Sequence, residues 1–490
     1  MKSKQIFNII LLYAAPLLIM PGCSKVLDKT PVTQIVTKTD STSISAADAE
    51  NLILGVYTSY KGYAYGLEFN VLDRITNGDV QSDNCYSGGD NPDNITIDLF
   101  KTNALNANVT RDWSDAYGMI ANATAAIYQV AACTDPALTA SRKSQILGET
   151  RFMRAFTYFD LVRTFGKVPL VLTLPDQSNS ENLIKSVLVP QSSVDSVYDA
   201  ILNDLWFART YVGDVGASTS KFIVSKGAVN ALLAKIYATK SPANWDSVAY
   251  YCDQVIPKYS LVTDFTYLWD NNHRDNSEAI WELTYFGYGG SDQIGNWIPS
   301  QFIGSGWKKF ETPTNDLVNT FRTEGDSVRL HASITFVDYG WQDNYWKDLS
   351  NFPILSKYND PNNGTNDFYL IRLADILLLR AEAYNAQGDY TDAAALVNQV
   401  RARVGLGPTT AATTTDMALA IEKERRLELA FEGQRWYDLL RTGRAIAVMN
   451  ALKDGSGNNL NYNVQSYQLL YPIPQAQLDL NPKLVQNEGY

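Results

Sequence analysis

Two neighbouring segments, 371–387 and 390–404, limit most strongly what this chain can fold into. The first carries apolar residues at helical spacing, at Ile371, Ala374, Leu378 and Ala381. The second carries a facing stripe at Ala393, Leu396, Val400 and Val404. Gly388 lies between the segments, where a turn is needed, and the small alanines on both stripes permit close contact. The sequence therefore predicts two helices packed face to face.

The spacing of Ala383, Tyr384, Gly388 and Ala393 resembles a tetratricopeptide repeat. A weaker echo of the same spacing occurs between positions 234 and 249. Because the repeats are irregular, we predict a mainly α-helical, tetratricopeptide-like scaffold with insertions. Further helices are expected from Ala46 onward and at 111–132, 144–165, 192–211, 225–240, 245–257, 416–432 and 434–450.

Residues 260–370 have a different character, because helical periodicity fades and Gly, Asn, Asp, Tyr and Trp accumulate. Six of the ten tryptophans of the chain lie here, at Trp269, Trp281, Trp297, Trp307, Trp341 and Trp346. We predict a loop-rich insert of short strands and a few short helices. In such sequence, aromatic rings are often presented to solvent, where they offer large contact area at low entropic cost. Trp307, Trp297 and Tyr285 are therefore candidate ligand-binding residues, although each one taken alone is more typical of a core.

The first 22 residues have the layout of a secretory signal peptide. Lys2 and Lys4 precede an apolar run at 6–20 that is short for a membrane span. Pro21-Gly22-Cys23 closes the run and resembles a bacterial lipobox, in which the cysteine is lipidated. The alternative is an ordinary signal peptide with an accidental cysteine. If Cys23 is lipidated, acyl chains hold the protein on a membrane surface.

These observations divide the chain into three parts. We predict a signal peptide at 1–22, a lipidated cysteine with a polar tether at 23–45, and one domain at 46–490. Within that domain the helical scaffold covers 46–260 and 371–450, the aromatic insert covers 260–370, and an extended tail covers 451–490.

Composition excludes several classes of function. The formal net charge of −11 argues against nucleic acid as a partner, because its phosphates would be repelled. With only His273 and His331, a histidine-rich metal site is impossible, and we expect no metal and no cofactor. The charged segment 421–432 interleaves Glu and Arg with apolar residues, and we expect structural ion pairs there, not catalysis. Cys85, Cys133 and Cys252 are expected to be small buried thiols.

Several longer motifs resemble, in order, those of the SusD/RagB family of outer-membrane nutrient-binding lipoproteins. They are Cys23, LDKTP at 27–31, ETRFMRA at 149–155, YFDLV at 158–162, RLAD at 372–375, AEAY at 381–384, ERRLELAFEGQRWYDL at 424–439, YPIP at 471–474 and QNEGY at 486–490.

The resemblance implies one large helical domain with four tetratricopeptide-like helix pairs on the outer face of the outer membrane. It also implies binding of a nutrient, usually a glycan, that is passed to a SusC-like, TonB-dependent transporter. By position, Asp83, Asn84 and Tyr86 resemble the other side of the binding surface in that family.

Two other functions stay open at the level of sequence. A surface glycoside hydrolase would need two carboxylates flanking a cleft, one with a raised pKa, and the sequence singles out no such pair. A tetratricopeptide scaffold that binds only protein would keep the tryptophan-rich insert packed inside. We favour a non-enzymatic, lipid-anchored protein that binds an oligosaccharide.

Overall fold

The structure is a computed structural model that describes residues 43–62, 72–214, 220–289, 294–302, 309–338, 343, 345–346 and 350–490. The predicted signal peptide, Cys23 and nearly all of the tether lie outside these residues. Helices dominate the described chain, as the sequence predicts.

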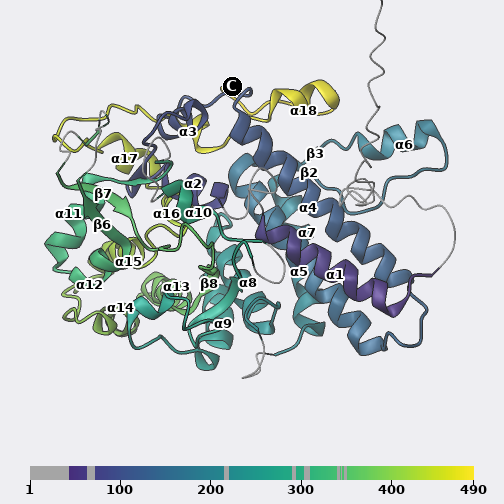
Figure 1. Ribbon diagram of the computed structural model, residues 1–490, viewed down its shortest axis with the longest axis horizontal. Coiled ribbons are helices and arrows are strands. Elements are labelled where there is room, and N and C mark those ends of the chain that lie inside the picture. The colour runs from purple at the N-terminus through teal and green to yellow at the C-terminus, as the bar shows by residue number, and fades with distance from the viewer. Residues whose placement is uncertain are drawn as a thin grey trace, which may run out of the picture. The chain divides into compact units, whose positions relative to one another are not determined.

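Four long helices form the first part of the scaffold: α1 (Ala46–Lys61), α4 (Ala107–Ala132), α5 (Ala140–Phe165) and α7 (Val194–Tyr211) (Figure 1). Each begins at a polar side chain that accepts a hydrogen bond from the first turn; Ser45 does so in α1. Helix α5 packs against both α4 and α7, which explains why its sequence is apolar nearly all round. Gly166 ends α5 with φ of +74°, a conformation that favours glycine.

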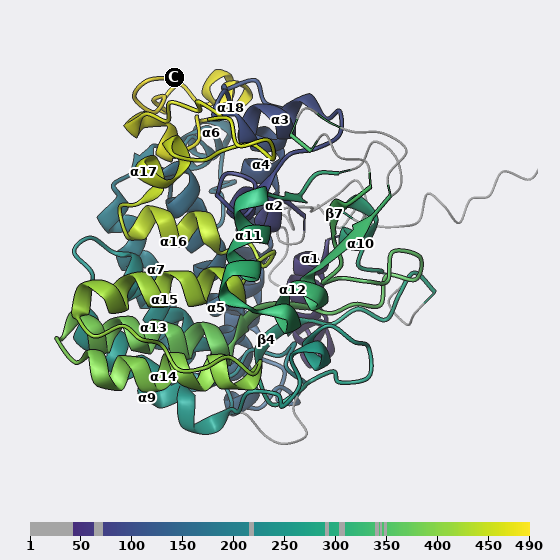
Figure 2. The ribbon, with the colours of Figure 1, turned by 90° about the vertical axis from the view of Figure 1, so that its left-hand side faces the viewer.

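The second part stacks α8 (Lys226–Thr239), α9 (Trp245–Val255), α13 (Leu373–Ala386), α14 (Tyr390–Arg403) and α15 (Thr414–Glu428) (Figure 2). The predicted facing stripes of α13 and α14 are confirmed, since they meet in one buried cluster that includes Leu378, Ala381, Ala393 and Val400. Gly388 makes the turn with φ of +87°.

Two predicted helix bounds are wrong. Ile371 belongs to strand β8 (Phe368–Arg372), because this segment pairs with β4 (Ala279–Leu283) before helix α13 begins. The expected single helix at 434–450 is two short helices, α16 (Arg435–Arg441) and α17 (Ala445–Asn450). Gly443 separates them with φ of +70°.

The insert contains short strands and short helices, as predicted. Strand β4 pairs with β8, and β6 (Ile334–Val337) pairs with β7 (Phe352–Leu355), both antiparallel. Strand β5 (Thr312–Pro313) pairs with β1 (Cys85–Tyr86), which joins the insert to a segment more than 200 residues earlier. The insert helices are α10 (Ile298–Phe302), α11 (Asn315–Glu324) and α12 (Ser327–Ser333).

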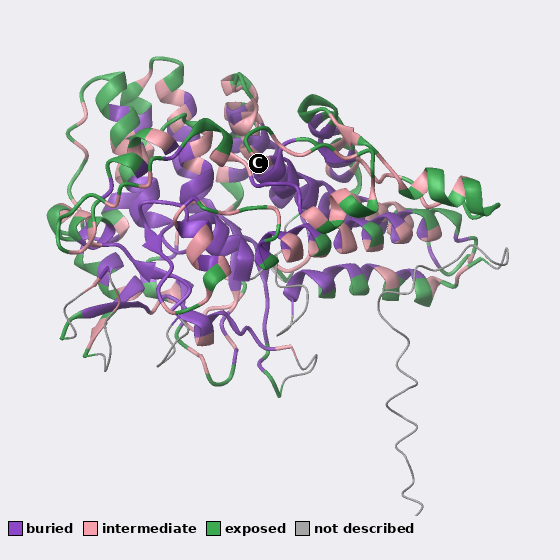
Figure 3. Ribbon diagram, turned by 90° about the horizontal axis from the view of Figure 1, so that it is seen from above, coloured by how far each residue is buried: buried purple, intermediate pink, exposed green. Residues whose placement is uncertain are grey.

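The remaining elements of the described part of the chain are short. They are α2 (Arg74–Asp79), α3 (Pro92–Asp98), β2 (Val168–Pro169), α6 (Ser180–Val187), β3 (Gln191–Ser192), α18 (Gln475–Leu480) and three 3₁₀ helices at Ile256–Lys258, Phe265–Leu268 and Ser466–Leu469. Burial is concentrated in the packed helices and in the strands beneath the surface loops (Figure 3). Among the described residues, no helix is both long enough and apolar enough to cross a bilayer.

The charged segment 421–432 is part of the architecture, as expected. Glu428, at the end of α15, receives Arg372 and Arg329 at 2.5 and 2.9 Å, and all three side chains are buried. Arg372 also pairs with Glu278 and Glu432. A buried charge is tolerated only with such partners, so these pairs hold α15 to the insert strands. The three predicted thiols, Cys85, Cys133 and Cys252, are buried and free.

Candidate functional site

The six residues singled out by sequence fall into three structural situations. Trp307 lies outside the described residues. Trp297 and Tyr285 are buried, with exposed fractions of 8% and 0%. The Tyr285 hydroxyl donates to the backbone carbonyl of Lys61, so this ring ties the insert to the end of α1.

Asp83 and Asn84 are buried and hold arginines of the helical scaffold. Arg435 reaches Asp83 through two hydrogen bonds of 2.7 and 2.9 Å, and Arg426 donates to Asn84 Oδ1 at 2.9 Å. Burial alone would raise the pKa of Asp83, but the charges of Arg426 and Arg435 outweigh burial and lower the pKa to about 2. Both side chains therefore fix the position of the 83–86 segment.

Tyr86 connects this segment to the insert. Its ring stacks on Tyr345, with centroids 4.1 Å apart and planes 14° apart, and its hydroxyl bonds to Asp343. Its backbone pairs with Thr312 of β5. The structure thus brings the two sequence-predicted segments, 83–86 and the insert, against each other.

Two solvent-exposed rings of the insert were missed by the sequence analysis. Phe286 and Tyr288 have exposed fractions of 53% and 45%, and they flank Gly287 directly after the buried Tyr285. Residues 278–285 are all buried, so no alternation of buried and exposed side chains along β4 marks Phe286 as outward. No local pattern of the sequence therefore distinguished these two rings from the buried Tyr285.

Cationic side chains flank the exposed Phe286 ring. The Lys61 ammonium lies 5.6 Å and the Arg274 guanidinium 5.4 Å from the ring centroid. The backbone N–H of Tyr288 donates to the carbonyl of Asn363 at 3.0 Å, which holds the 286–288 segment against the loop before β8. Lys61 is buried, whereas Arg274 is partly exposed. We call Phe286, Tyr288 and Arg274 the ring surface. It combines apolar ring faces with guanidinium donors at the rim.

Two carboxyl groups lie beneath the ring surface. Asp367 accepts the backbone N–H of Tyr285 at 2.8 Å and pairs with Arg274 at 3.2 Å. Burial raises its pKa to about 6. Burial, and then the charge of Asp367, raise the pKa of Glu282 to about 8. Glu282 has no exposed surface, so it cannot touch a molecule bound at the ring surface.

Within the described residues, no group of three or more His, Cys, Asp or Glu side chains could hold a metal ion. Aspartates of segment 79–98 have different hydrogen-bond partners. Asp79 accepts a hydrogen bond from the backbone N–H of Gly433, and Asp98 accepts hydrogen bonds from the backbone N–H of Ser87 and from the Tyr462 hydroxyl.

Comparisons with known proteins give a consistent result along the chain. Residues 349–490 match the SusD family, and residues 27–238 match a family described as starch-binding and associating with the outer membrane. A SusD-like protein, P38, from Formosa agariphila is 27% identical over the whole of both chains.

Solved structures agree in fold. A SusD superfamily protein from Bacteroides vulgatus is 22% identical, covers 91% of this chain and 99% of its own, and superposes with a TM-score of 0.77. A laminarin-binding SusD-like protein is 25% identical, covers 91% of this chain and all of its own, and has a TM-score of 0.73.

Proposed function

Because the chain is a SusD-like protein, we propose that it binds an oligosaccharide at the outer membrane and presents it to a SusC-like, TonB-dependent transporter. The match of residues 27–238 to a starch-binding, outer-membrane-associated family supports carbohydrate binding. The laminarin-binding relative extends the set of plausible glycans beyond starch.

The observation that carries the proposal is the ring surface. Sugars have flat C–H faces that stack on aromatic rings, and their hydroxyl groups need polar partners beside the ring. Phe286 and Tyr288 supply half-exposed rings, and the partly exposed Arg274 supplies donors next to Phe286. We assign sugar contact to these residues and to Trp307.

We assign a positioning role to the other residues predicted from sequence. Tyr285 and Trp297 pack beneath the surface, and Asp83, Asn84 and Tyr86 hold the neighbouring segment by hydrogen bonds and stacking. Their substitution should change ligand affinity mainly by moving the loops that carry the exposed rings.

The test is calorimetry with maltoheptaose, a starch fragment, and laminarihexaose, a laminarin fragment. We expect dissociation constants between micromolar and millimolar, equivalent to about 4–8 kcal/mol. Phe286→Ala and Tyr288→Ala should each weaken binding about three- to tenfold, since a ring contact contributes on the order of 1 kcal/mol. Tyr250→Ala, an equally exposed ring on α9, is the matched control. Unchanged affinity in both ring variants would contradict the assigned surface.

The anchor and the transporter are separate parts of the proposal. Cys23→Ala should release the protein from the membrane fraction or leave it unprocessed, because acyl chains supply the attachment. Normal processing with full membrane retention would contradict lipidation. Copurification of a TonB-dependent barrel with the wild-type chain would support the transporter partnership.

One observation bears on the rival function of a glycoside hydrolase. Glu282 and Asp367 are two neighbouring carboxyl groups with raised pKa values beneath the ring surface. A hydrolase would need both beside the scissile bond, and the burial of Glu282 argues for binding without catalysis. Release of reducing sugar from starch or laminarin, abolished by Glu282→Gln, would overturn this view.

A further inference from the structure

A second concave site lies in the helical scaffold, outside the insert. A cleft of about 710 Å³ opens where the turn between α8 and α9, the C-terminal end of α13, and helices α15 and α16 meet. Figure 2 shows α9, α13, α15 and α16 on one side of the view and β7 and α10 on the other. None of the residues that line the cleft belongs to the ring surface. Its volume falls in the range of about 300–1,000 Å³ that small-molecule sites occupy.

The floor of the cleft consists of charges that are already paired. Arg441 reaches both carboxylate oxygens of Glu382, and Arg425 reaches Asp438 at 2.9 Å. Burial alone would raise the pKa of Asp438, but Arg425 and Arg441 outweigh burial and lower it. The floor therefore stays ionised and compensated at neutral pH.

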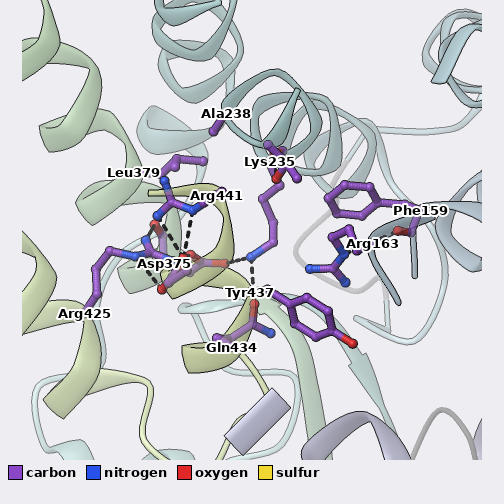
Figure 4. Close-up of a pocket in the computed structure, with 12 residues that line it drawn as sticks. Phe159, Arg163, Lys235, Ala238, Asp375, Leu379, Arg425, Gln434, Tyr437 and Arg441 are labelled. Atoms are coloured by element: carbon purple, nitrogen blue, oxygen red, sulfur yellow. Dashed lines mark hydrogen bonds and ion pairs between the residues drawn. The ribbon is translucent and has the colours of Figure 1, made fainter. Parts of the chain in front are cut away.

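A smaller cavity adjoins this floor and shares Arg425, Asp438 and Arg441 with it. Figure 4 shows Asp375 there, bound by Lys235 on one side and Arg425 on the other. This inner cavity has a volume of only about 20 Å³, enough for one water molecule. A ligand would therefore remain in the outer cleft.

The charges at the rim are paired as well. Glu422 pairs with Arg444 at 2.6 Å and with Arg435 at 3.0 Å. Every charged side chain that lines the cleft thus has an opposite charge within the wall. A charged ligand would have to displace one of these pairs, whereas a neutral ligand would not.

The rim also offers an aromatic ring and unused polar groups. Trp245 is half-buried at the start of α9, where part of its ring packs against the main hydrophobic core. Among the described residues its indole N–H has no hydrogen-bond partner. The side-chain oxygen of Asn385 lacks a hydrogen bond there too. Thr414 and Thr415 are exposed at the mouth, next to the half-exposed Leu419.

We propose that this cleft is a second carbohydrate site that takes a short neutral oligosaccharide. Trp245 provides the stacking face, and Asn385, Thr414 and Thr415 bond to sugar hydroxyls. The proposal rests on the proposed function only for the class of ligand. With one site on the insert and one on the scaffold, a long glycan that spans both would bind more tightly than either fragment, because the second contact is intramolecular.

Two variants address the cleft without touching the ring surface. Trp245→Ala removes the ring, and Ala418→Trp fills the mouth from an exposed position on α15. Trp206→Ala is the matched control, since this tryptophan is half-exposed on α7 and does not line the cleft. Circular dichroism checks the fold of each variant.

The measurement is the calorimetric stoichiometry of the full chain with maltoheptaose and with laminarihexaose, in a detergent without a sugar headgroup. We expect two equivalents for the wild type and for Trp206→Ala with at least one probe. Each cleft variant should keep one equivalent, which is bound at the ring surface. Adding Phe286→Ala and Tyr288→Ala to a cleft variant should remove this remaining equivalent.

The outcomes separate the two proposals. Two equivalents in both folded cleft variants, or one wild-type equivalent that the ring-surface variants abolish, would overturn the cleft proposal and leave the proposed function standing. One wild-type equivalent abolished only by the cleft variants would support the cleft and contradict the ring surface. No binding of either probe would contradict both.

Discussion

The helical scaffold and the aromatic insert use the same kinds of side chain in different ways. In the scaffold, charged side chains are buried and paired, as Arg372 and Glu428 are, and alanines allow close helix contact. In the insert, aromatic rings do much of the packing. Trp281 packs edge to face against Phe152 and Phe156 of α5, with ring centroids 4.9 and 4.8 Å apart. The insert is therefore locked to the scaffold from below, while Phe286 and Tyr288 remain open above.

This difference indicates where each region tolerates change. The scaffold depends on a few buried ion pairs, so losing one charged side chain leaves its partners buried without an opposite charge. The outer layer of the insert carries rings that contribute contact area to a ligand and little to the fold. Substitutions in the two regions should therefore separate stability from binding.

The largest effect should come from Arg372→Ala in the buried ion-pair network. Arg372 neutralises Glu278, Glu428 and Glu432, so its loss leaves buried carboxylates without a partner. We expect about 3–5 kcal/mol lower free energy of unfolding. Urea unfolding followed by circular dichroism measures it.

The control for this substitution is Lys185→Ala, which breaks an exposed pair with Glu181 on α6. Exposed pairs contribute little, so its unfolding midpoint should match the wild type. Equal midpoints for Arg372→Ala and Lys185→Ala would show that the buried ion pairs of Arg372 stabilise the fold no more than an exposed pair does.

Overpacking the helix pair should have the next largest effect. Ala381 is fully buried between α13 and α14, and Ala381→Trp should cost roughly 1–3 kcal/mol or more. Ala386→Trp lies on the same helix at an exposed position and should change the melting temperature little. If both variants melt with the wild type, the close contact between α13 and α14 is wrong.

The insert should show a pH dependence of its own through Glu282. The pKa of Glu282 is raised to about 8 in the folded protein. At a pH between the ordinary pKa of a glutamate and 8, the native state therefore keeps a proton that the unfolded chain has released. Stability from this group is present at low pH and is lost as the pH rises toward 8. Asp367, whose pKa is raised to about 6, adds to this loss of stability in the lower part of the pH range.

Glu282→Gln tests the pH dependence, because the amide stays neutral. The variant should gain about 1.4 kcal/mol or more relative to wild type between pH 5 and pH 8, which corresponds to at least one unit of pKa shift. Melting temperatures at the two pH values measure the gain. A parallel pH profile in both proteins would show that Glu282 is not the group responsible.

The sequence predicted the scaffold well because helix contacts repeat locally. The stripe at Leu378 and Ala381, the turn at Gly388 and the structural role of 421–432 all follow from spacing within about 20 residues. One error arises from a distant partner, since Ile371 joins a strand that pairs with β4. The other is local, because Gly443, with φ of +70°, divides a segment whose apolar pattern continues.

The candidate site was less predictable because distant partners decide its contacts. Tyr86 meets Thr312 and Tyr345, which are more than 200 residues away, and no local pattern encodes that contact. Composition drew attention to the aromatic residues of the insert, but it could not tell the buried Tyr285 from its exposed neighbour Phe286. Only the direction of each side chain after β4 distinguishes them.

The smallest effects should separate these two neighbouring rings. Tyr285→Phe removes the hydroxyl that donates to the Lys61 carbonyl and should cost about 1 kcal/mol of stability, the net value of a buried hydrogen bond. Phe286→Ala should change stability by less than about 0.5 kcal/mol, because the ring is half-exposed. The order should reverse for oligosaccharide affinity, where Phe286→Ala has the larger effect. Parallel urea unfolding and calorimetry on both variants test this reversal. If Phe286→Ala destabilises the fold as much as Tyr285→Phe does, then Phe286 contributes to the packing of the insert, and the ring surface would reduce to Tyr288 and its neighbours.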